Sequence, residues 1–152
     1  MKRCRSPAGS ARETRNFNKM RILLISTDYK VVYSNFFSIG LGYIAALLRE
    51  NNIETKLSII LTDEDVNALV NLIKEWGPRV IGFSAVTSQI RFIKKITERI
   101  RGITDALIIC GGIHPTLRPE ETLREIGGLD AIVRGEGEYP LLDLAERLNA
   151  GR

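Results

Sequence analysis

Residues suited to holding a ligand follow the apolar runs of this chain. Hydroxyl side chains come after one run, a pair of glycines after the next, and a glycine–acid repeat after the last. The candidate binding residues are Ser84, Thr87, Ser88, Gly111, Gly112, His114, Gly135, Glu136, Gly137 and Glu138. Hydroxyls can donate hydrogen bonds, and glycines let a bulky ligand lie against the backbone because no Cβ stands in the way. The pattern indicates a binding crevice.

Each of these residues also has an ordinary structural interpretation. The hydroxyls of Ser84, Thr87 and Ser88 bind a ligand or cap the helix that follows them. His114 contacts a ligand or fixes the turn GGIHPT, and the repeat 135–138 either touches a ligand or is a plain strand-to-helix turn. We favour the ligand role for the hydroxyls, because they end a central strand, and leave His114 open.

Several familiar sites are excluded. His114 is the only histidine, so neither a multi-histidine metal site nor a Ser-His-Asp triad can be built. The loop after the first apolar run, Ser26–Lys30, has no glycine, which argues against a dinucleotide fingerprint and a P-loop. We therefore predict no catalytic residues and no metal ligands, and interpret the chain as a binding module.

The elements that would position these residues alternate regularly. Strand-like runs are expected at 21–26, 54–61, 80–85, 106–110 and 131–133, and helices at 40–51, 63–76, 88–101, 119–126 and 138–149. Five strand–helix units with apolar strands predict an α/β fold of three layers, a doubly wound five-stranded parallel sheet. We expect the flavodoxin-like, Rossmann-like order 2-1-3-4-5, in which ligands bind at the carboxyl ends of the strands.

Composition and charge narrow the class of partner. The chain has 152 residues and a net charge of +4, but residues 1–20 alone carry six Lys/Arg and one acid, so the remainder is at −1. The folded part therefore gives no electrostatic case for nucleic acid.

No apolar run approaches the roughly 18–20 residues that span a bilayer. The two cysteines lie far apart, which favours a reducing cytoplasm over a disulfide framework. We expect residues 1–19 to form a disordered basic leader and residues 20–150 to form one domain.

Four segments carry a resemblance to a known family. The segments are GLGYIAALLREN (40–51), VIGFSAVTSQ (80–89), CGGIHPTLRPEE (110–121) and VRGEGEYPLLDLAE (133–146). In this order the chain resembles the N-terminal cobalamin (B12)-binding domain of B12-dependent radical SAM enzymes, many of which are methyltransferases.

The resemblance implies base-off cobalamin at the carboxyl edge of the sheet, with its nucleotide tail packed on the paired glycines. It implies that the hydroxyl loop, Gly111, Gly112 and the loop 135–138 surround this tail, so that Gly112→Val should block cobalamin while leaving the sheet folded. The D-x-H-x-x-G lower-ligand motif is not present, since Lys30 stands at the place of its histidine. We expect Lys30 not to ligate cobalt.

The resemblance also implies a partner. The C-x-x-x-C-x-x-C motif of a radical SAM barrel is missing, so the 4Fe-4S cluster and S-adenosylmethionine would belong to a separate or missing barrel domain or subunit. The expected function is a cobalamin module supporting methyl transfer or a related reaction. The alternatives are a scaffold domain of the same fold that has lost cobalamin, and a small nucleotide- or flavin-binding protein.

Overall fold

The computed structural model describes residues 19–28 and 38–151. In chain order its elements are β1 (Arg21–Thr27), α1 (Ile39–Glu50), β2 (Glu54–Ile60), α2 (Asp63–Trp76), β3 (Val80–Ser84), the 3-10 turn η1 (Thr87–Gln89), α3 (Ile90–Arg101), β4 (Leu107–Gly111), α4 (Ile113–Leu117), α5 (Pro119–Glu125), β5 (Ala131–Ile132) and α6 (Glu138–Asn149). Residues 1–18 of the predicted leader 1–19, and Lys30, lie outside the described residues.

The five strands form one sheet in which every pair is parallel, in the order β2-β1-β3-β4-β5. This confirms the predicted α/β fold and its strand order. Ser26, Ser84 and Gly111 are register partners at the carboxyl ends of β1, β3 and β4. Residues far apart in the sequence are thus brought side by side at one edge of the sheet.

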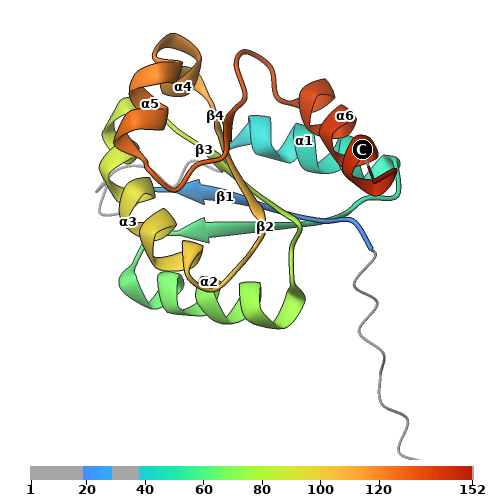
Figure 1. Ribbon diagram of the computed structural model, residues 1–152, viewed down its shortest axis with the longest axis horizontal. Coiled ribbons are helices and arrows are strands. Elements are labelled where there is room, and N and C mark those ends of the chain that lie inside the picture. The colour runs from blue at the N-terminus through green and yellow to red at the C-terminus, as the bar shows by residue number, and fades with distance from the viewer. Residues whose placement is uncertain (1–18, 29–37, 152) are drawn as a thin grey trace, which may run out of the picture.

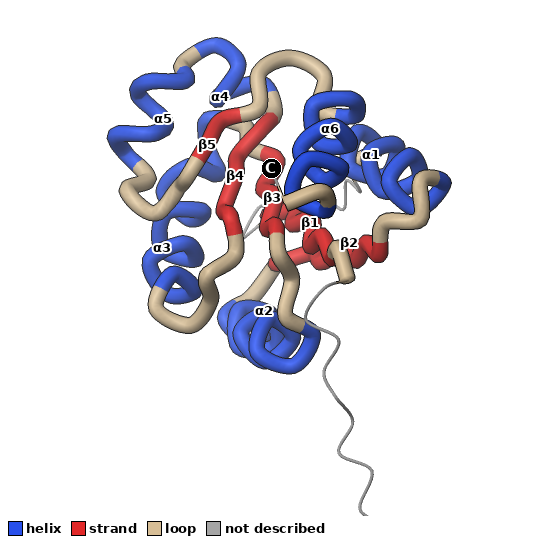
Figure 2. Tube along the Cα trace, turned by 45° about the vertical axis from the view of Figure 1, so that its right-hand side comes forward, coloured by secondary structure: helices blue, strands red, loops and turns tan. Residues whose placement is uncertain are grey.

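Helices cover both faces of the sheet (Figures 1 and 2). Alternate strand residues point to opposite faces, so Leu23 and Ile25 of β1 pack with α2 and α3, while Ile22 and Leu24 pack with α1 and α6. We call these the α2/α3 face and the α1/α6 face. Because both faces are covered, the strands are almost continuously apolar, as expected of a buried parallel sheet.

The long helix α2 shows how local sequence sets its ends. The Thr62 side chain accepts from the Asp65 amide, and the Asp65 carboxylate accepts from the Leu61 and Thr62 amides, which closes a capping box. These backbone hydrogen bonds hold the pKa of Asp65 below its usual range. Gly77 ends the helix in the left-handed conformation, at φ +61°.

The segment after β4 differs from the prediction. Residues 113–117 form the short helix α4, where we expected a loop, and the helix predicted from Pro119 becomes the separate helix α5. Strand β4 also runs one residue further, since the Gly111 carbonyl accepts from the Ala85 amide at 2.8 Å. Gly112, at φ +101°, then redirects the chain into α4. Glycine adopts this positive φ readily, whereas residues with a Cβ rarely do, so the turn requires glycine at this position.

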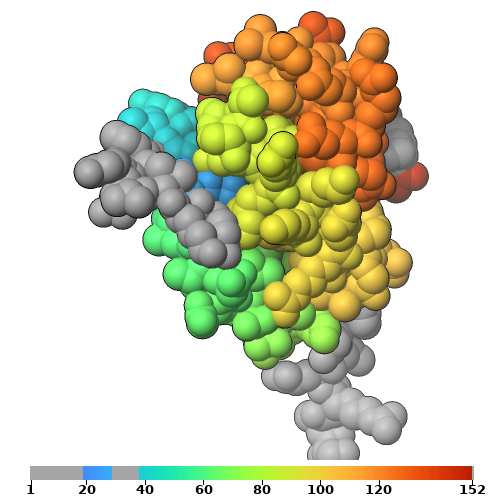
Figure 3. Space-filling model, turned by 90° about the vertical axis from the view of Figure 1, so that its left-hand side faces the viewer, coloured from blue at the N-terminus to red at the C-terminus, as the bar shows by residue number. Residues whose placement is uncertain are grey.

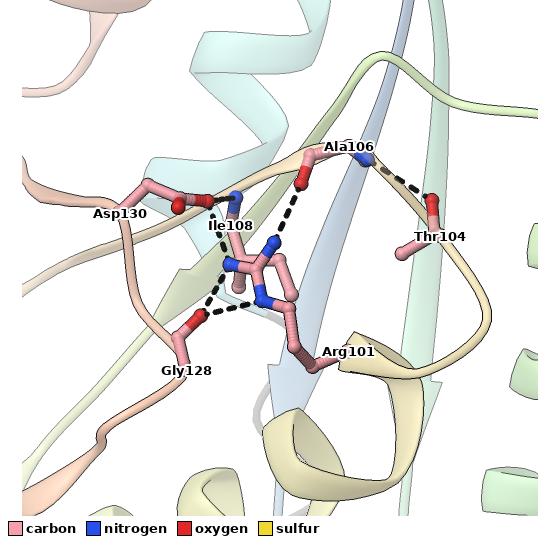
Figure 4. A network of polar contacts seen from close by, with 6 residues as sticks. All are labelled: Arg101, Thr104, Ala106, Ile108, Gly128 and Asp130. Atoms are coloured by element: carbon pink, nitrogen blue, oxygen red, sulfur yellow. Dashed lines mark hydrogen bonds and ion pairs between the residues drawn. The ribbon is translucent and has the colours of Figure 1, made fainter.

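The two-residue strand β5 is held in place by Arg101, at the end of α3 (Figure 4). The guanidinium donates to the carbonyls of Gly128 and Ala106 and forms an ion pair with Asp130 at 2.7 Å. The same Asp130 carboxylate accepts from the Ile108 amide of β4, also at 2.7 Å. This network fixes the start of β5 against β4 and therefore the origin of the loop that follows it.

The described part of the chain contains no helix long and apolar enough to cross a membrane.

Lys19, the last residue of the predicted leader, is described, and its Nζ lies 3.0 Å from the Glu54 carboxylate. Glu54 also accepts from the Trp76 indole at 3.0 Å. That hydrogen bond and the one from Lys19 lower the pKa of Glu54.

Candidate functional site: a glycine-lined crevice

A cavity of about 130 Å³ lies at the carboxyl end of the sheet, between its α1/α6 face and the two helices. Figure 3 looks onto this edge of the molecule, with α1, the segment after β3 and α4 arranged around it. The cavity is lined by Leu24, Gly40, Leu41, Ile44, Gly82, Phe83, Ser84, Ile109, Gly111, Gly112, Val133, Gly135, Glu136, Gly137, Glu138 and Leu141.

The sheet supplies one wall of the cavity. Leu24, Gly82 and Ile109 come from the three adjacent central strands and line it together. A Cβ added to Gly82 would lie 3.1 Å from Leu24 Cδ2 and 3.7 Å from an Ile109 side-chain carbon. A side chain at this position would crowd the Leu24 and Ile109 side chains on the neighbouring strands. The glycine in β3 therefore keeps the wall shallow.

The two glycines at the carboxyl end of β4, Gly111 and Gly112, serve different purposes. A Cβ on Gly112 would lie 2.7 Å from the Ala85 carbonyl oxygen and 2.8 Å from its amide nitrogen, and the residue has φ +101°. Gly112→Val would thus strain the turn itself and press on the backbone of Ala85, so loss of binding in this variant would not distinguish a blocked crevice from a disturbed turn. A Cβ on Gly111 would meet only Val133, at 3.5 Å. Of the two glycines, Gly111 is therefore the one at which an added Cβ makes only ordinary van der Waals contacts.

The loop after β5 supplies the opposite side. Gly135 has φ +72°, and an added Cβ there would meet nothing within 4 Å. A Cβ on Gly137 would approach Ile44 Cδ1 to 2.8 Å. Glu136 and Glu138 stand between and after these glycines and also line the cavity. The acids come at the start of α6, where the helix dipole favours negative charge.

The structure brings together seven of the ten predicted binding residues. Ser84, Gly111, Gly112 and residues 135–138 line the cavity, whereas Thr87, Ser88 and His114 do not. His114 is buried in α4, with Nδ1 3.0 Å from the Thr87 hydroxyl. Its Nε2 has no hydrogen-bond partner among the described residues. Thr87 and His114 thus join the loop after β3 to the one after β4.

Reasoning from the sequence missed the contribution of α1 and of the strand interiors. Gly40, Leu41 and Ile44 line the cavity from α1, and none of them was among the predicted binding residues. The glycine inside the apolar run VIGFS, Gly82, was the available signal, because glycine within a strand marks a close approach. The role of α1 depends on how the helix packs, which no local pattern encodes.

The cavity is lined mainly by glycines and apolar side chains, with Ser84, Glu136 and Glu138 as its polar side chains. The described residues contain no group of three or more His, Cys, Asp or Glu side chains placed to hold a metal ion. Burial raises the pKa of the Cys110 thiol to about 12, and Cys110 packs in the core of the α2/α3 face. It is neither a thiolate nucleophile at neutral pH nor part of the cavity.

Comparisons with known proteins place the chain in a family. The model of the B12 binding domain family matches residues 26–145. An uncharacterized methyltransferase of Pyrococcus horikoshii is 31% identical over 139 residues, which cover 88% of this chain and 30% of that protein. The anaerobic magnesium-protoporphyrin IX monomethyl ester cyclase of Rubrivivax gelatinosus is 27% identical, covering 88% of this chain and 25% of that protein. This chain thus spans between a quarter and a third of the length of these relatives.

Solved structures share the fold. The radical S-adenosylmethionine methyltransferase TsrM from Kitasatospora setae, with cobalamin and a 4Fe-4S cluster bound, superposes with a TM-score of 0.70 at 20% identity, covering 88% of this chain and 25% of that one. The cobalamin-dependent S-adenosylmethionine radical enzyme OxsB superposes with a TM-score of 0.71, also at 20% identity, covering 90% of this chain and 19% of that one. Together with the family match over most of its length, these findings show that the chain belongs to the B12-binding domain family, as the resemblance of its motifs indicated.

Proposed function

We propose that this domain holds base-off cobalamin, with the nucleotide tail of the cofactor inserted in the crevice of the α1/α6 face. The observation that carries the proposal is the lining of the cavity. Five glycines besides Gly112 face it, and added side chains at Gly82 and Gly137 would crowd the neighbouring residues. A cavity at the carboxyl edge of a parallel sheet, with glycines at many of its lining positions, suits an inserted ligand.

The size of the cavity supports partial rather than complete enclosure. Its volume of about 130 Å³ is below the roughly 300 Å³ at which ordinary small-molecule sites begin. A corrin ring is too large for this space, whereas one flat heterocycle with its linker is of the right order. The macrocycle would therefore rest outside, over the loops at the edge of the sheet.

The chain's own residues would hold the tail by shape and a few polar contacts. Leu24, Ile109 and Leu141 offer apolar surface to a heterocycle. The Ser84 hydroxyl, at the carboxyl end of β3, can form a hydrogen bond with the ligand. Bound cobalamin supplies a cobalt centre able to carry a methyl group. We assign this domain the binding and orientation of the cofactor and no bond-making residue.

The partner that completes the reaction would be a radical SAM barrel domain or subunit holding the 4Fe-4S cluster and S-adenosylmethionine. The comparisons support this step, because TsrM is a radical S-adenosylmethionine methyltransferase with cobalamin and a 4Fe-4S cluster bound, and this chain covers only 25% of it. We propose methyl transfer or a related radical reaction for the complete system.

The proposal is tested by adding hydroxocobalamin to the purified chain and removing the free cofactor by gel filtration. We expect retained cobalamin with the absorption spectrum of the base-off form. Gly111→Leu should abolish retention, since its side chain enters the cavity beside Val133 with no backbone clash. Gly127→Leu is the matched control, because Gly127 has open space around it and lies outside the lining.

Two results would contradict the proposal. A folded wild-type chain that retains no cobalamin would favour a scaffold domain that has lost the cofactor. Retention by Gly111→Leu equal to that of Gly127→Leu would show that cobalamin binds elsewhere on the molecule. Circular dichroism of each variant establishes that it is folded before its binding is compared.

A further inference from the structure

One hydroxyl joins two of the loops that line the cavity. Thr116 Oγ1 donates to the carbonyl oxygen of Gly112 at 2.7 Å and accepts from the amide of Gly135 at 3.0 Å. A hydroxyl has one proton to donate and lone pairs with which to accept, so a single side chain can make both bonds at once. Gly112 follows β4 and Gly135 follows β5, and both line the cavity.

Thr116 itself does not line the cavity. It is half-buried on α4. Its hydroxyl therefore acts on the cavity through the two backbone turns it connects. Gly112 and Gly135 both have positive φ, +101° and +72°, so both turns need glycine and gain no side-chain packing of their own.

The loop after β5 has few other restraints near this point. Strand β5 is two residues long, and a Cβ on Gly135 would meet no atom within 4 Å. Glycine also has the largest backbone freedom of any residue, which the fold must restrict if the loop is to keep one position. The hydrogen bond from the Gly135 amide to Thr116 is a restraint of this kind.

The neighbouring loops are joined in the same way. The Gln89 side chain donates to Asp28 Oδ1 at 3.1 Å and also to the Thr27 carbonyl, which links the ends of β1 and β3. The contact between Thr87 and His114 links the loops after β3 and β4. Thr116 makes the remaining link, from the loop after β4 to the loop after β5.

We propose that Thr116 is a positioning residue, whose hydroxyl sets the gap between the Gly112 and Gly135 turns and so the width of the crevice. The role of this gap in ligand binding rests on the proposed function, but the restraint itself does not. An experiment on the ligand-free chain can therefore test the restraint separately.

The test compares Thr116→Val, which keeps the shape and removes the hydroxyl, with Thr116→Ser, which keeps the hydroxyl. Thr122→Val is the control. Thr122 Oγ1 donates to the Arg118 carbonyl at 2.7 Å, the same kind of bond to the residue four positions earlier. Among the hydrogen bonds of the described residues, no backbone amide of another loop donates to Thr122 Oγ1. Thr122→Val thus removes a comparable helical hydroxyl but leaves the hydrogen bond between Thr116 and Gly135 in place.

The first measurement is amide hydrogen exchange of Gly135 in the ligand-free chain. A typical hydrogen bond corresponds to an effect of about three- to tenfold, so Thr116→Val should speed Gly135 exchange by about that factor. Thr116→Ser should restore the wild-type rate, and Thr122→Val should leave it unchanged. Unchanged Gly135 exchange in Thr116→Val would overturn the inference, whether or not the chain binds cobalamin.

The second measurement is dissociation of bound hydroxocobalamin. We expect release to be about three- to tenfold faster from Thr116→Val and near the wild-type rate from Thr116→Ser. Equal release from Thr116→Val and wild type, despite altered Gly135 exchange, would overturn the positioning role. Failure of the wild type to bind cobalamin would instead count against the proposed function, and Gly135 exchange would still decide whether the link between the turns exists.

Discussion

The two faces of the sheet are built for different purposes. On the α2/α3 face, residues such as Ile81, Ile93 and Ile100 are completely buried in one large apolar cluster. On the α1/α6 face, packing is close toward the amino ends of the strands, but near their carboxyl ends it opens into the cavity. One face contributes stability through burial, and the other leaves space near the edge where ligands bind.

Strand β3 shows the difference within five residues. Ile81 and Phe83 point to the α2/α3 face and are at most 2% exposed. Gly82 and Ser84, between and after them, line the cavity together with part of Phe83. Because strand residues alternate between faces, one strand can hold the core together on one side and keep a ligand slot open on the other. Stability and binding can therefore be separated by mutation.

The largest expected effect separates the faces by stability. Leu69→Ala, in α2, removes a side chain that is 1% exposed, and should lower the free energy of unfolding by about 2–5 kcal/mol through lost burial and a new void. Leu41→Ala, in α1, enlarges a cavity that already exists, so its cost should lie at or below the lower end of that range. Urea unfolding of both variants measures the difference.

The comparison between the two leucines fails if they cost the same. Equal losses would mean that the α1/α6 face is packed as tightly around Leu41 as the opposite face is around Leu69. Cobalamin retention by the same two variants extends the comparison to binding. For variants shown to be folded, only Leu41→Ala should retain less cobalamin, because Leu41 lines the cavity and Leu69 does not.

A smaller effect separates binding from stability in the opposite direction. Gly40→Leu places a side chain at the cavity from α1, where an added Cβ meets nothing within 4 Å. Leucine is the better helix former by about 0.5–1 kcal/mol, so the variant should be slightly more stable. Cobalamin affinity should nevertheless fall at least about tenfold, or about 1.4 kcal/mol. Thermal unfolding and equilibrium dialysis give the two quantities.

Gly102→Leu is the control for this variant. Gly102 ends α3 with right-handed helical angles and open space around it, and it lies outside the cavity lining. It should accept leucine with unchanged cobalamin affinity. A Gly40→Leu chain that binds as tightly as Gly102→Leu would show that the mouth of the cavity does not admit the cofactor from the side of α1.

The last prediction concerns the Cys110 thiol on the α2/α3 face, whose ionisation has no effect on stability at neutral pH. Burial raises its pKa from 9.0 to about 12, so the folded chain keeps this proton at pH values where the unfolded chain releases it. Stability linked to this group is present below about pH 9 and falls as pH rises toward 12. In a Cys4→Ser background, iodoacetamide should label Cys110 only on unfolding. Rapid labelling of Cys110 in the folded chain at pH 8 would contradict its burial in the α2/α3 face.

Much of the fold could be predicted from the sequence, for reasons visible in particular segments. The apolar runs at 21–26 and 80–85 indicated buried strands, and their alternation with helices indicated a parallel sheet. The helix α4 was missed because five residues, IHPTL, carry too short a pattern, and because the conformation of Gly112 directs the chain there. Strand β5 was predicted one residue too long, since its two residues depend on the Arg101 network.

The site was predictable where it depends on local chemistry. The glycines and Ser84 at the strand ends line the cavity, because parallel strands bring their carboxyl ends together. The separate tasks of Gly111 and Gly112 were not predictable, since they depend on distances to Ala85 and Val133. The link through Thr116 depends on a turn 19 residues away.

The most direct test of the central claim compares two ligands with the same wild-type chain. Cobalamin and cobinamide share the corrin ring, but cobinamide lacks the nucleotide tail. If the crevice of the α1/α6 face holds that tail, cobalamin should bind at least about tenfold more tightly than cobinamide, and Gly111→Leu should reduce the two affinities to the same value. Equal affinities of the wild-type chain for cobalamin and cobinamide would contradict the claim, because they would show that the tail makes no contribution to binding.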